Sequence, residues 1–288
     1  MNYENLSLYN QWLDYQKKSL AKLINIDTED KEKISFLYFE YFLRVLPKVK
    51  YNVYLSKELL ENPLYKKYKE VINTIKTNAE NSISLKPYLS KGIKNIAKSD
   101  AMLNDWGVLH FHLGKELKND FIKRTGDLLF VYRDVRLKPN ELYFLDIFNH
   151  NSWSKKRTIE ILHNNWGNII KHYKVEVLVD IEPKLNDEEH LLLRNENVNS
   201  AISLSDGTAY IMLGGGITTA GTNQEATMMK INYMKEFRDL ELNILEKYKI
   251  KKEHLILKIN DDKAYVYLDI PYLAENKKII MLNDIHRL

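Results

Sequence analysis

The spacing of apolar residues in the first third of the chain favours helices. Residues 28–47 begin with acidic side chains, continue as an apolar stretch and end at Pro47, which predicts a helix. Residues 50–56 alternate between polar and apolar positions as a strand does. Apolar side chains then return to helical spacing over 62–80, and a shorter helix is predicted over 91–103.

The pattern changes to strands in the middle of the chain. Apolar stretches over 108–113, 128–135 and 142–148 predict a three-stranded β-meander. An amphipathic helix follows over 154–170, and a fourth strand is expected over 175–181.

The last third combines short strands with one long helix. Paired strands are predicted within 201–213 and within 254–270, a helix over 225–248, and a final strand over 279–282. The fold class expected is therefore α+β, with a helical N-terminal region, a central antiparallel meander with a packed helix, and C-terminal hairpins plus one long helix.

Three regions follow from this reading. They are a mainly helical region over 1–100, a β-meander and helix core over 101–183, and an α+β region with a glycine-rich loop over 184–288.

The chain has 288 residues and no cysteine, which excludes disulfides, thiolate catalysis and cysteine-based zinc sites. The start of the sequence lacks the pattern of a signal peptide, and its apolar stretches are short for a membrane span. We therefore expect a cytoplasmic protein with no membrane partner.

The net charge of +4 is unevenly distributed. Residues 1–100 carry 17 Lys and Arg against 12 Asp and Glu, whereas 174–288 carry 15 against 19. A basic surface attracts polyanions, so RNA or another nucleic acid is the expected partner, and ordinary surface solvation is the alternative. A protein inhibitor or an assembly partner is a further expectation.

Histidines provide the main chemical signal, because five of the eight lie between His110 and His172. On a strand, His110 and His112 would point to the same face. The meander would bring His150 to the same end of the sheet. Arg124 lies in the loop that leads into the second strand, and His163 lies on the helix that follows the third strand. Metal-independent RNA cleavage needs a base, an acid and a cation for the phosphorane, and these side chains could supply them.

Two other interpretations of the histidines stay open. His110, His112 and His150 with Asp105 or Asp146 could form a zinc or manganese site, although no cofactor is predicted. Alternatively, the histidines are structural and hydrogen-bonded at a strand edge. His163 could border the core, or form a base–orienter pair with Glu160 one helical turn away.

Two further segments are candidates for substrate binding. Trp153 precedes Lys155, Lys156 and Arg157, and such a mixture suits base stacking and phosphate contact. The glycine cluster Gly214, Gly215 and Gly216, followed by Thr218, permits close approach of a ligand. A solvated helix face and a tightly turned loop are the respective alternatives.

Several segments of the chain together resemble those of a group of known sequences. They are Leu103-Asn104-Asp105-Trp106-Gly107, His110-Phe111-His112-Leu113-Gly114, Arg124-Thr125-Gly126-Asp127-Leu128-Leu129-Phe130, His163-Asn164-Asn165-Trp166 and Leu213-Gly214-Gly215-Gly216. The chain resembles a group of uncharacterised bacterial proteins over residues 85–222. This resemblance implies one structural unit and brings no activity or catalytic residues with it.

The order helix, three-stranded meander, helix and strand is also similar to the small RelE-type ribonuclease toxins. The leading hypothesis is a toxin-like or phage-defence nuclease acting on RNA, with His110 or His112 as base, His150 or His163 as acid, and Arg124 stabilising the phosphorane. A metal-dependent hydrolase and a non-catalytic binding component of a bacterial defence system are the alternatives.

Overall fold

The computed structural model describes residues 6–95, 100–175, 184–260, 263–268 and 278–282. The chain divides into two compact units, one formed by residues 43–225 and the other by residues 1–42 together with 226–288. Among the described helices, none combines the length and the apolar character needed to cross a membrane.

The larger unit is built on a four-stranded mixed sheet. Its strands are ordered β1 (Asn52–Leu55), β6 (Glu141–Asn149), β5 (Asp127–Tyr132) and β2 (Val108–His112). β2, β5 and β6 form the antiparallel meander expected from the sequence, while β1 pairs with β6 in parallel. The predicted α+β class is confirmed.

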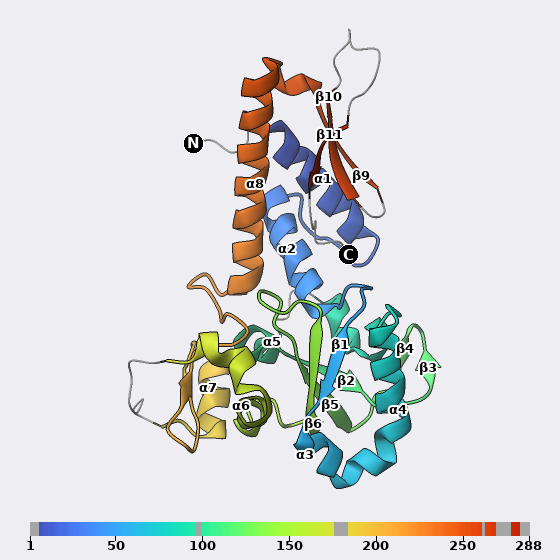
Figure 1. The fold of residues 1–288 in the computed structure, drawn as a ribbon, viewed down its shortest axis with the longest axis vertical. Coiled ribbons are helices and arrows are strands. Elements are labelled where there is room, and N and C mark those ends of the chain that lie inside the picture. The colour runs from blue at the N-terminus through green and yellow to red at the C-terminus, as the bar shows by residue number, and fades with distance from the viewer. Residues whose placement is uncertain (1–5, 96–99, 176–183, 261–262, 269–277, 283–288) are drawn as a thin grey trace. The chain divides into compact units, whose positions relative to one another are not determined.

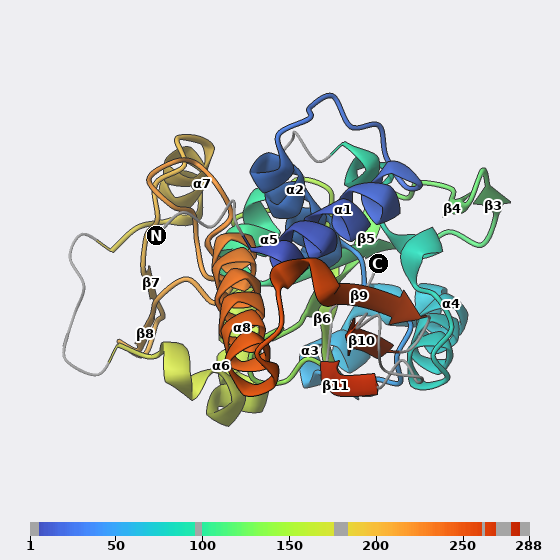
Figure 2. The same ribbon diagram turned by 90° about the horizontal axis from the view of Figure 1, so that it is seen from above.

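Helices cover both faces of this sheet. α3 (Lys57–Glu61) and α4 (Pro63–Glu80) lie on one side, while α6 (Arg157–Ile170) and α7 (Asp187–Asn195) lie on the other (Figure 1; Figure 2). The short helix α5 (Ala101–Trp106) leads into β2 and ends at Gly107, which adopts the left-handed conformation (φ 69°) that favours glycine. Short 3-10 turns occupy Lys86–Tyr88, Lys91–Lys94 and Lys171–Tyr173.

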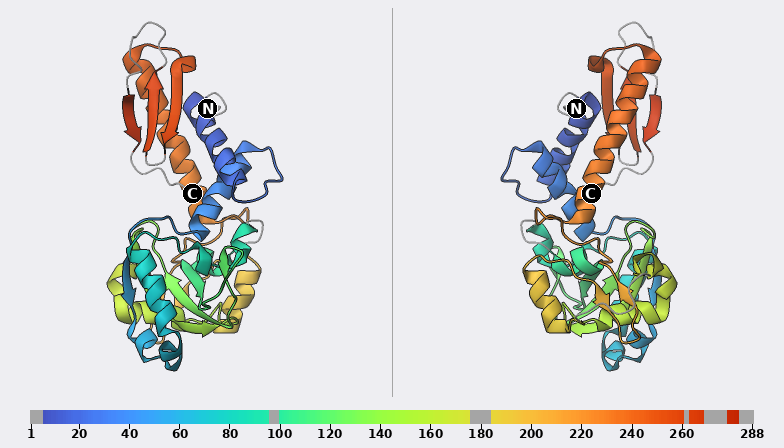
Figure 3. Two further views of the ribbon diagram at one scale, coloured as in Figure 1. Left: turned by 90° about the vertical axis from the view of Figure 1, so that its right-hand side faces the viewer. Right: turned by 90° about the vertical axis from the view of Figure 1, so that its left-hand side faces the viewer.

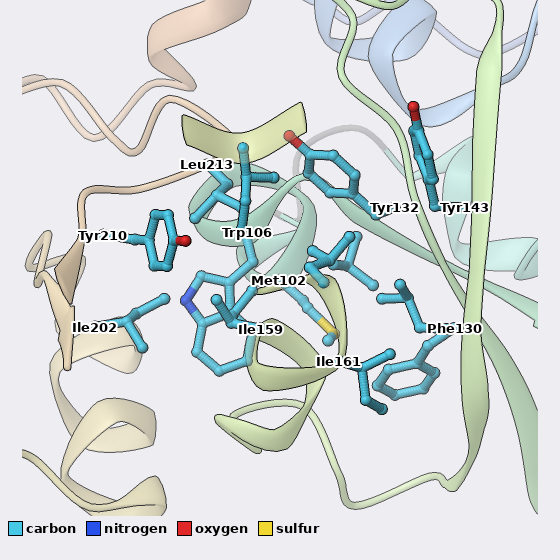
Figure 4. Packing of buried hydrophobic residues seen from close by; sticks show 14 of the residues in the cluster. Met102, Trp106, Phe130, Tyr132, Tyr143, Ile159, Ile161, Ile202, Tyr210 and Leu213 are labelled. Atoms are coloured by element: carbon cyan, nitrogen blue, oxygen red, sulfur yellow. The ribbon is translucent and has the colours of Figure 1, made fainter. Parts of the chain in front are cut away.

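The hydrophobic core of this unit fills the space between the sheet and α6. Figure 4 shows Trp106 of α5, Phe130 and Tyr132 of β5, and Ile159 and Ile161 of α6 within one cluster. These five side chains are at most 1% exposed. Because β5 is buried on both faces, its sequence is almost continuously apolar.

Two small hairpins extend from the sheet unit. The ribbon of β3 (Leu117–Lys118) and β4 (Phe121–Ile122) is inserted between β2 and β5, and it projects from the body in Figure 2. β7 (Ile202–Ser203) pairs with β8 (Ala209–Tyr210) across the turn expected at Ser205–Thr208.

The other unit combines three helices with a sheet (Figure 3). They are α1 (Ser7–Ala21), most of α2 (Lys31–Arg44) and α8 (Gln224–Tyr248), and a 3-10 turn at Lys252–His254 precedes the sheet. The sheet is ordered β11 (Lys278–Leu282), β10 (Lys263–Leu268), β9 (Leu255–Asn260).

Trp12 organises the core of this unit. Its ring stacks on Tyr15 and Tyr233 at centroid distances of 5.3 and 5.4 Å, and it meets Tyr38 edge-on. Gln11 on the same helix donates to the carbonyl of Leu255 at the start of β9. The helices therefore share one aromatic core, and a hydrogen bond connects α1 to the start of the sheet.

The structure adds four elements that the hydrophobic pattern did not predict, namely α1, α3, α7 and the β3–β4 ribbon. The predicted helix over 91–103 is a 3-10 turn followed by α5 across residues outside the described range, and most of the predicted strand over 175–181 also lies outside it. The two compact units differ from the three regions drawn from the sequence, because residues 43–225 cluster together.

Candidate functional site

Strand alternation places the two histidines of β2 on the face that α6 covers. Val108, His110 and His112 stand opposite Tyr132, Phe130 and Leu128 in the antiparallel register. All of those partners belong to the core on this face. His112 is buried (2% exposed), whereas His110 is half-buried, so the histidines occupy the point where the core meets the surface.

A tight series of turns after β6 brings Trp153 next to the histidines of β2. The Asn149 side chain accepts hydrogen bonds from the amide of Asn151 and the hydroxyl of Ser152. The chain reverses there, and the Trp153 ring stacks on Phe130 with an angle of 13° between the planes. Such local side-chain bonds are typical of asparagine at turns.

Trp153 stands beside two imidazoles. The rings of His110 and His150 each lie edge-on to it, both at a centroid distance of 4.9 Å. His150 is exposed, and its amide donates to the carbonyl of Gly126, which continues the β5–β6 pairing beyond the last strand residues. The prediction that the meander brings His150 to the end of β2 therefore agrees with this geometry.

The charges around the histidines favour neutral imidazoles. Burial lowers the pKa of His110, Asp100 opposes this, and the electrostatic effects of His150 and Arg124 lower the pKa further. Burial, followed by His110, Arg124 and His150, lowers the pKa of His112 to about 4. Four of the five residues predicted to be catalytic thus act on one another electrostatically.

The base of the β3–β4 ribbon contacts His112. The amide of Thr125 donates to its Nδ1 at 3.4 Å. The Thr125 hydroxyl accepts from the amide of Leu113 and donates to the carbonyl of Asp127. His112 is therefore connected to the residues that follow the ribbon, and its lowered pKa leaves it neutral at pH 7.

Asp100 is a member of the site that sequence reasoning missed. Its side chain caps α5 by accepting from the amide of Leu103, and its negative charge raises the pKa of His110. In the sequence, Asp100 lies inside the segment 91–103 that is predicted to be one helix, so the pattern indicates neither a cap nor a contact with a histidine ten residues later.

Arg194 on α7 was also missed, and it holds the Trp153 loop in place. It donates to the carbonyl of Trp153 and, through Nε and Nη2, to one carboxylate oxygen of Asp105 at 3.0 and 2.7 Å. The guanidinium carbon lies 4.2 Å from the ring centroid of Trp106. Arg194 links α5, α7 and the loop that carries Trp153.

His163 lies in a different cluster. Its Nδ1 lies 2.8 Å from the Tyr210 hydroxyl and its Nε2 lies 3.1 Å from Asp206 in the β7–β8 turn. Glu160, its predicted orienter, is not among these partners. The structure therefore places His163 with the small hairpin and apart from Trp153.

The basic residues after Trp153 differ in their surroundings. Lys155 and Arg157 are exposed. Lys156 donates from Nζ to the carbonyl of Leu185 and from its amide to Asp187, so it connects this segment to the start of α7.

The glycine loop lies against the end of α5. A Cβ on Gly214 would come within 2.1 Å of the Leu103 carbonyl oxygen, so the close approach requires glycine there. Gly215 and Gly216 have φ values of 92° and 84°, and Thr218 bonds to Thr222 within its own turn. These contacts give the loop a packing role, and its role in substrate binding stays a prediction.

The two carboxylates considered for a metal site are bound to other groups. Asp105 pairs with Arg194, and Asp146 accepts from the side-chain amide of Asn62 at 2.6 Å. Among the residues described, no three His, Asp or Glu side chains converge as metal ligands would.

Comparison with family models, curated proteins and solved structures finds no match to this chain. The likeness to RelE-type toxins and to the bacterial group stays a prediction, and a likeness in fold does not by itself establish function.

Proposed function

We propose that the larger unit is a metal-independent ribonuclease whose reaction is carried out by His110, His150 and Arg124. The observation that carries the proposal is the pair of imidazoles beside one Trp153 ring, with an arginine close enough to lower the pKa of His110. Two imidazoles and a cation are the groups that transfer of an RNA phosphoryl group requires.

His110 suits the role of base. Its lowered pKa leaves it unprotonated at neutral pH, and the residue is half-buried where the core meets the surface. It would take the proton of a ribose 2′-hydroxyl as the 2′-oxygen attacks phosphorus. His150 would donate a proton to the departing 5′-oxygen, so that the P–O5′ bond breaks and a 2′,3′-cyclic phosphate forms.

Arg124 and His112 would assist this reaction. Arg124 is exposed beside the imidazoles, and its guanidinium suits the charge on the phosphorane oxygens. His112 is buried and its Nδ1 accepts from the Thr125 amide, which suits a positioning residue in place of the base considered for it from the sequence. His163 lies in another cluster, so His150 is preferred as the acid.

The first test compares single variants on total RNA. Wild-type protein should cleave RNA equally with and without EDTA, and His110→Asn and His150→Asn should each lower the rate by about 10²-fold or more. His172→Asn is the matched control, because His172 is exposed in the same unit and lies in the 3-10 turn after α6.

Three results would count against the proposal. They are absence of cleavage by wild type, unchanged cleavage by both site variants, and loss of cleavage in EDTA. The last result would favour a metal-dependent hydrolase, and the first would favour a non-catalytic nucleic-acid or protein-binding component of a defence system.

A further inference from the structure

The β3–β4 ribbon carries a basic surface next to the candidate site. The exposed cations on it and on the neighbouring 3-10 turn are Lys91, Lys94, Lys115, Lys118, Lys123 and Arg124. Glu116 and Asp120 are its acidic members. The turn and the ribbon together thus carry six exposed cations against two carboxylates.

The ribbon is held in place by buried side chains of β4 and by a tight turn. Phe121 and Ile122 of β4 are buried, and Lys94 lies over the Phe121 ring at 5.4 Å. Asn119 and Asp120 form the two-residue turn with φ values of 51° and 67°, as a tight hairpin of this type requires. The exposed strand β3 is thereby kept at the surface with its lysine outward.

Some of these cations are available to a ligand. Lys115 pairs with Glu70 and Lys123 with Glu116. Within the part of the chain that the structure describes, Lys91, Lys118 and Arg124 form no ion pair. An exposed cation without a counter-charge is the usual form of a phosphate contact.

The base of the ribbon lies directly on the candidate site. Thr125, the first residue after Arg124, donates to His112, and Gly114 at the other end of the insertion packs against the carbonyl of Lys123. A polyanion bound along the ribbon would therefore be led to the histidines beside Trp153.

We infer that the β3–β4 ribbon is the arm that binds the sugar–phosphate backbone of single-stranded RNA next to the cleaved bond. The inference rests on the proposed function for its choice of RNA as the polyanion. Contacts to phosphate by exposed lysines carry little sequence information, so the arm would give affinity and register while Trp153 offers a ring for base stacking.

The test measures binding of a fluorescent 2′-O-methyl oligoribonucleotide by anisotropy at several salt concentrations. This probe lacks the attacking hydroxyl, so wild-type full-length protein can be used. Lys91→Gln with Lys118→Gln should weaken binding several-fold and reduce the slope of log K against log salt by about 1.4, from about 0.7 for each phosphate contact on a single strand.

The control is Lys50→Gln with Lys171→Gln, which removes the same charge from the opposite end of the sheet. Lys50 precedes Asn52, which pairs with Glu141 at the start of β6, and Tyr173 near Lys171 bonds to Asp134 beyond the end of β5. Both lysines are exposed. This control should bind the probe as wild type does.

Equal weakening by the two double variants, or failure of wild type to bind the probe, would overturn the inference. Binding to phosphatidylserine vesicles without binding to the probe would overturn it as well. A different outcome separates the two proposals. If the ribbon variant alone loses probe binding and unmodified RNA is never cleaved, the ribbon binds RNA but the protein is not a ribonuclease.

Discussion

At the scale of single residues, burial determines what each histidine can do. His110, His112 and His150 span the range from half-buried to buried to exposed within one cluster. Burial disfavours the charged imidazole, so the pKa of His112 falls to about 4, well below its usual value of 6.5. A histidine of this kind is a structural and electrostatic partner more than a proton carrier at neutral pH.

The lowered pKa of His112 makes the fold sensitive to acid. The unfolded chain binds a proton near pH 6.5 and the folded chain near pH 4, so stability from this group is complete above 6.5 and is lost as pH falls toward 4. The loss amounts to about 3 kcal/mol. Urea unfolding of wild type and His112→Gln at pH 7 and pH 4 should show a smaller pH effect in the variant.

Carboxylates titrate in the same range in both proteins, so the difference between the two pH effects is the quantity that counts. Equal pH effects would show that His112 is not buried in its neutral form. His190, whose pKa is also lowered to about 4 by burial, stays in both proteins and cancels from the comparison.

At the scale of elements, the sequence predicted the individual helices and strands better than it predicted the contacts between them. The meander, α6 and α8 follow from apolar periodicity, because each buries a regular face. The ribbon was missed because its exposed strand β3 is two residues long and polar on one side. Arg194 was missed because its hydrogen-bond partners, Asp105 and Trp153, lie 89 and 41 residues earlier in the chain.

The fit of the glycine loop against α5 gives a prediction at this scale. Gly214→Ala would place a methyl group 2.1 Å from the Leu103 carbonyl oxygen and 2.5 Å from that of Asn104, and backbone atoms cannot move aside cheaply. We expect a loss of about 3 kcal/mol in the free energy of unfolding. Thermal or urea unfolding measures it.

Gly126→Ala is the control, because a Cβ at Gly126 meets nothing within 4 Å. Its effect should stay within about 0.5 kcal/mol. If the two glycine variants were equally stable, the loop would not contact α5 as closely as described.

At the scale of the whole molecule, two units with separate cores share one chain. The unit of residues 43–225 contains the candidate site, while Trp12 anchors the core of the other unit. The division is discontinuous in sequence, because residues from both ends of the chain form the second unit. Composition along the chain could not predict this, since the pairing of distant segments depends on side-chain packing.

A substitution that disrupts one core should therefore leave the backbone amides of the other unit protected from hydrogen exchange. Trp12→Ala removes a fully buried ring, which costs about 3–5 kcal/mol in comparable cores. Hydrogen exchange should show faster exchange in α1 and α8 of the variant and unchanged protection in β2 and β5. Equal loss of protection in β2 and β5 would show that the two units unfold as one.

In the reaction we propose, two imidazoles and an arginine promote cleavage of RNA by attack of the 2′-hydroxyl. The most direct measurement is identification of the new ends after wild-type protein acts on a defined RNA in EDTA. We expect 2′,3′-cyclic phosphate and 5′-hydroxyl ends, formed by wild type and lost in His110→Asn and His150→Asn. Intact RNA, or 5′-phosphate ends, would contradict it.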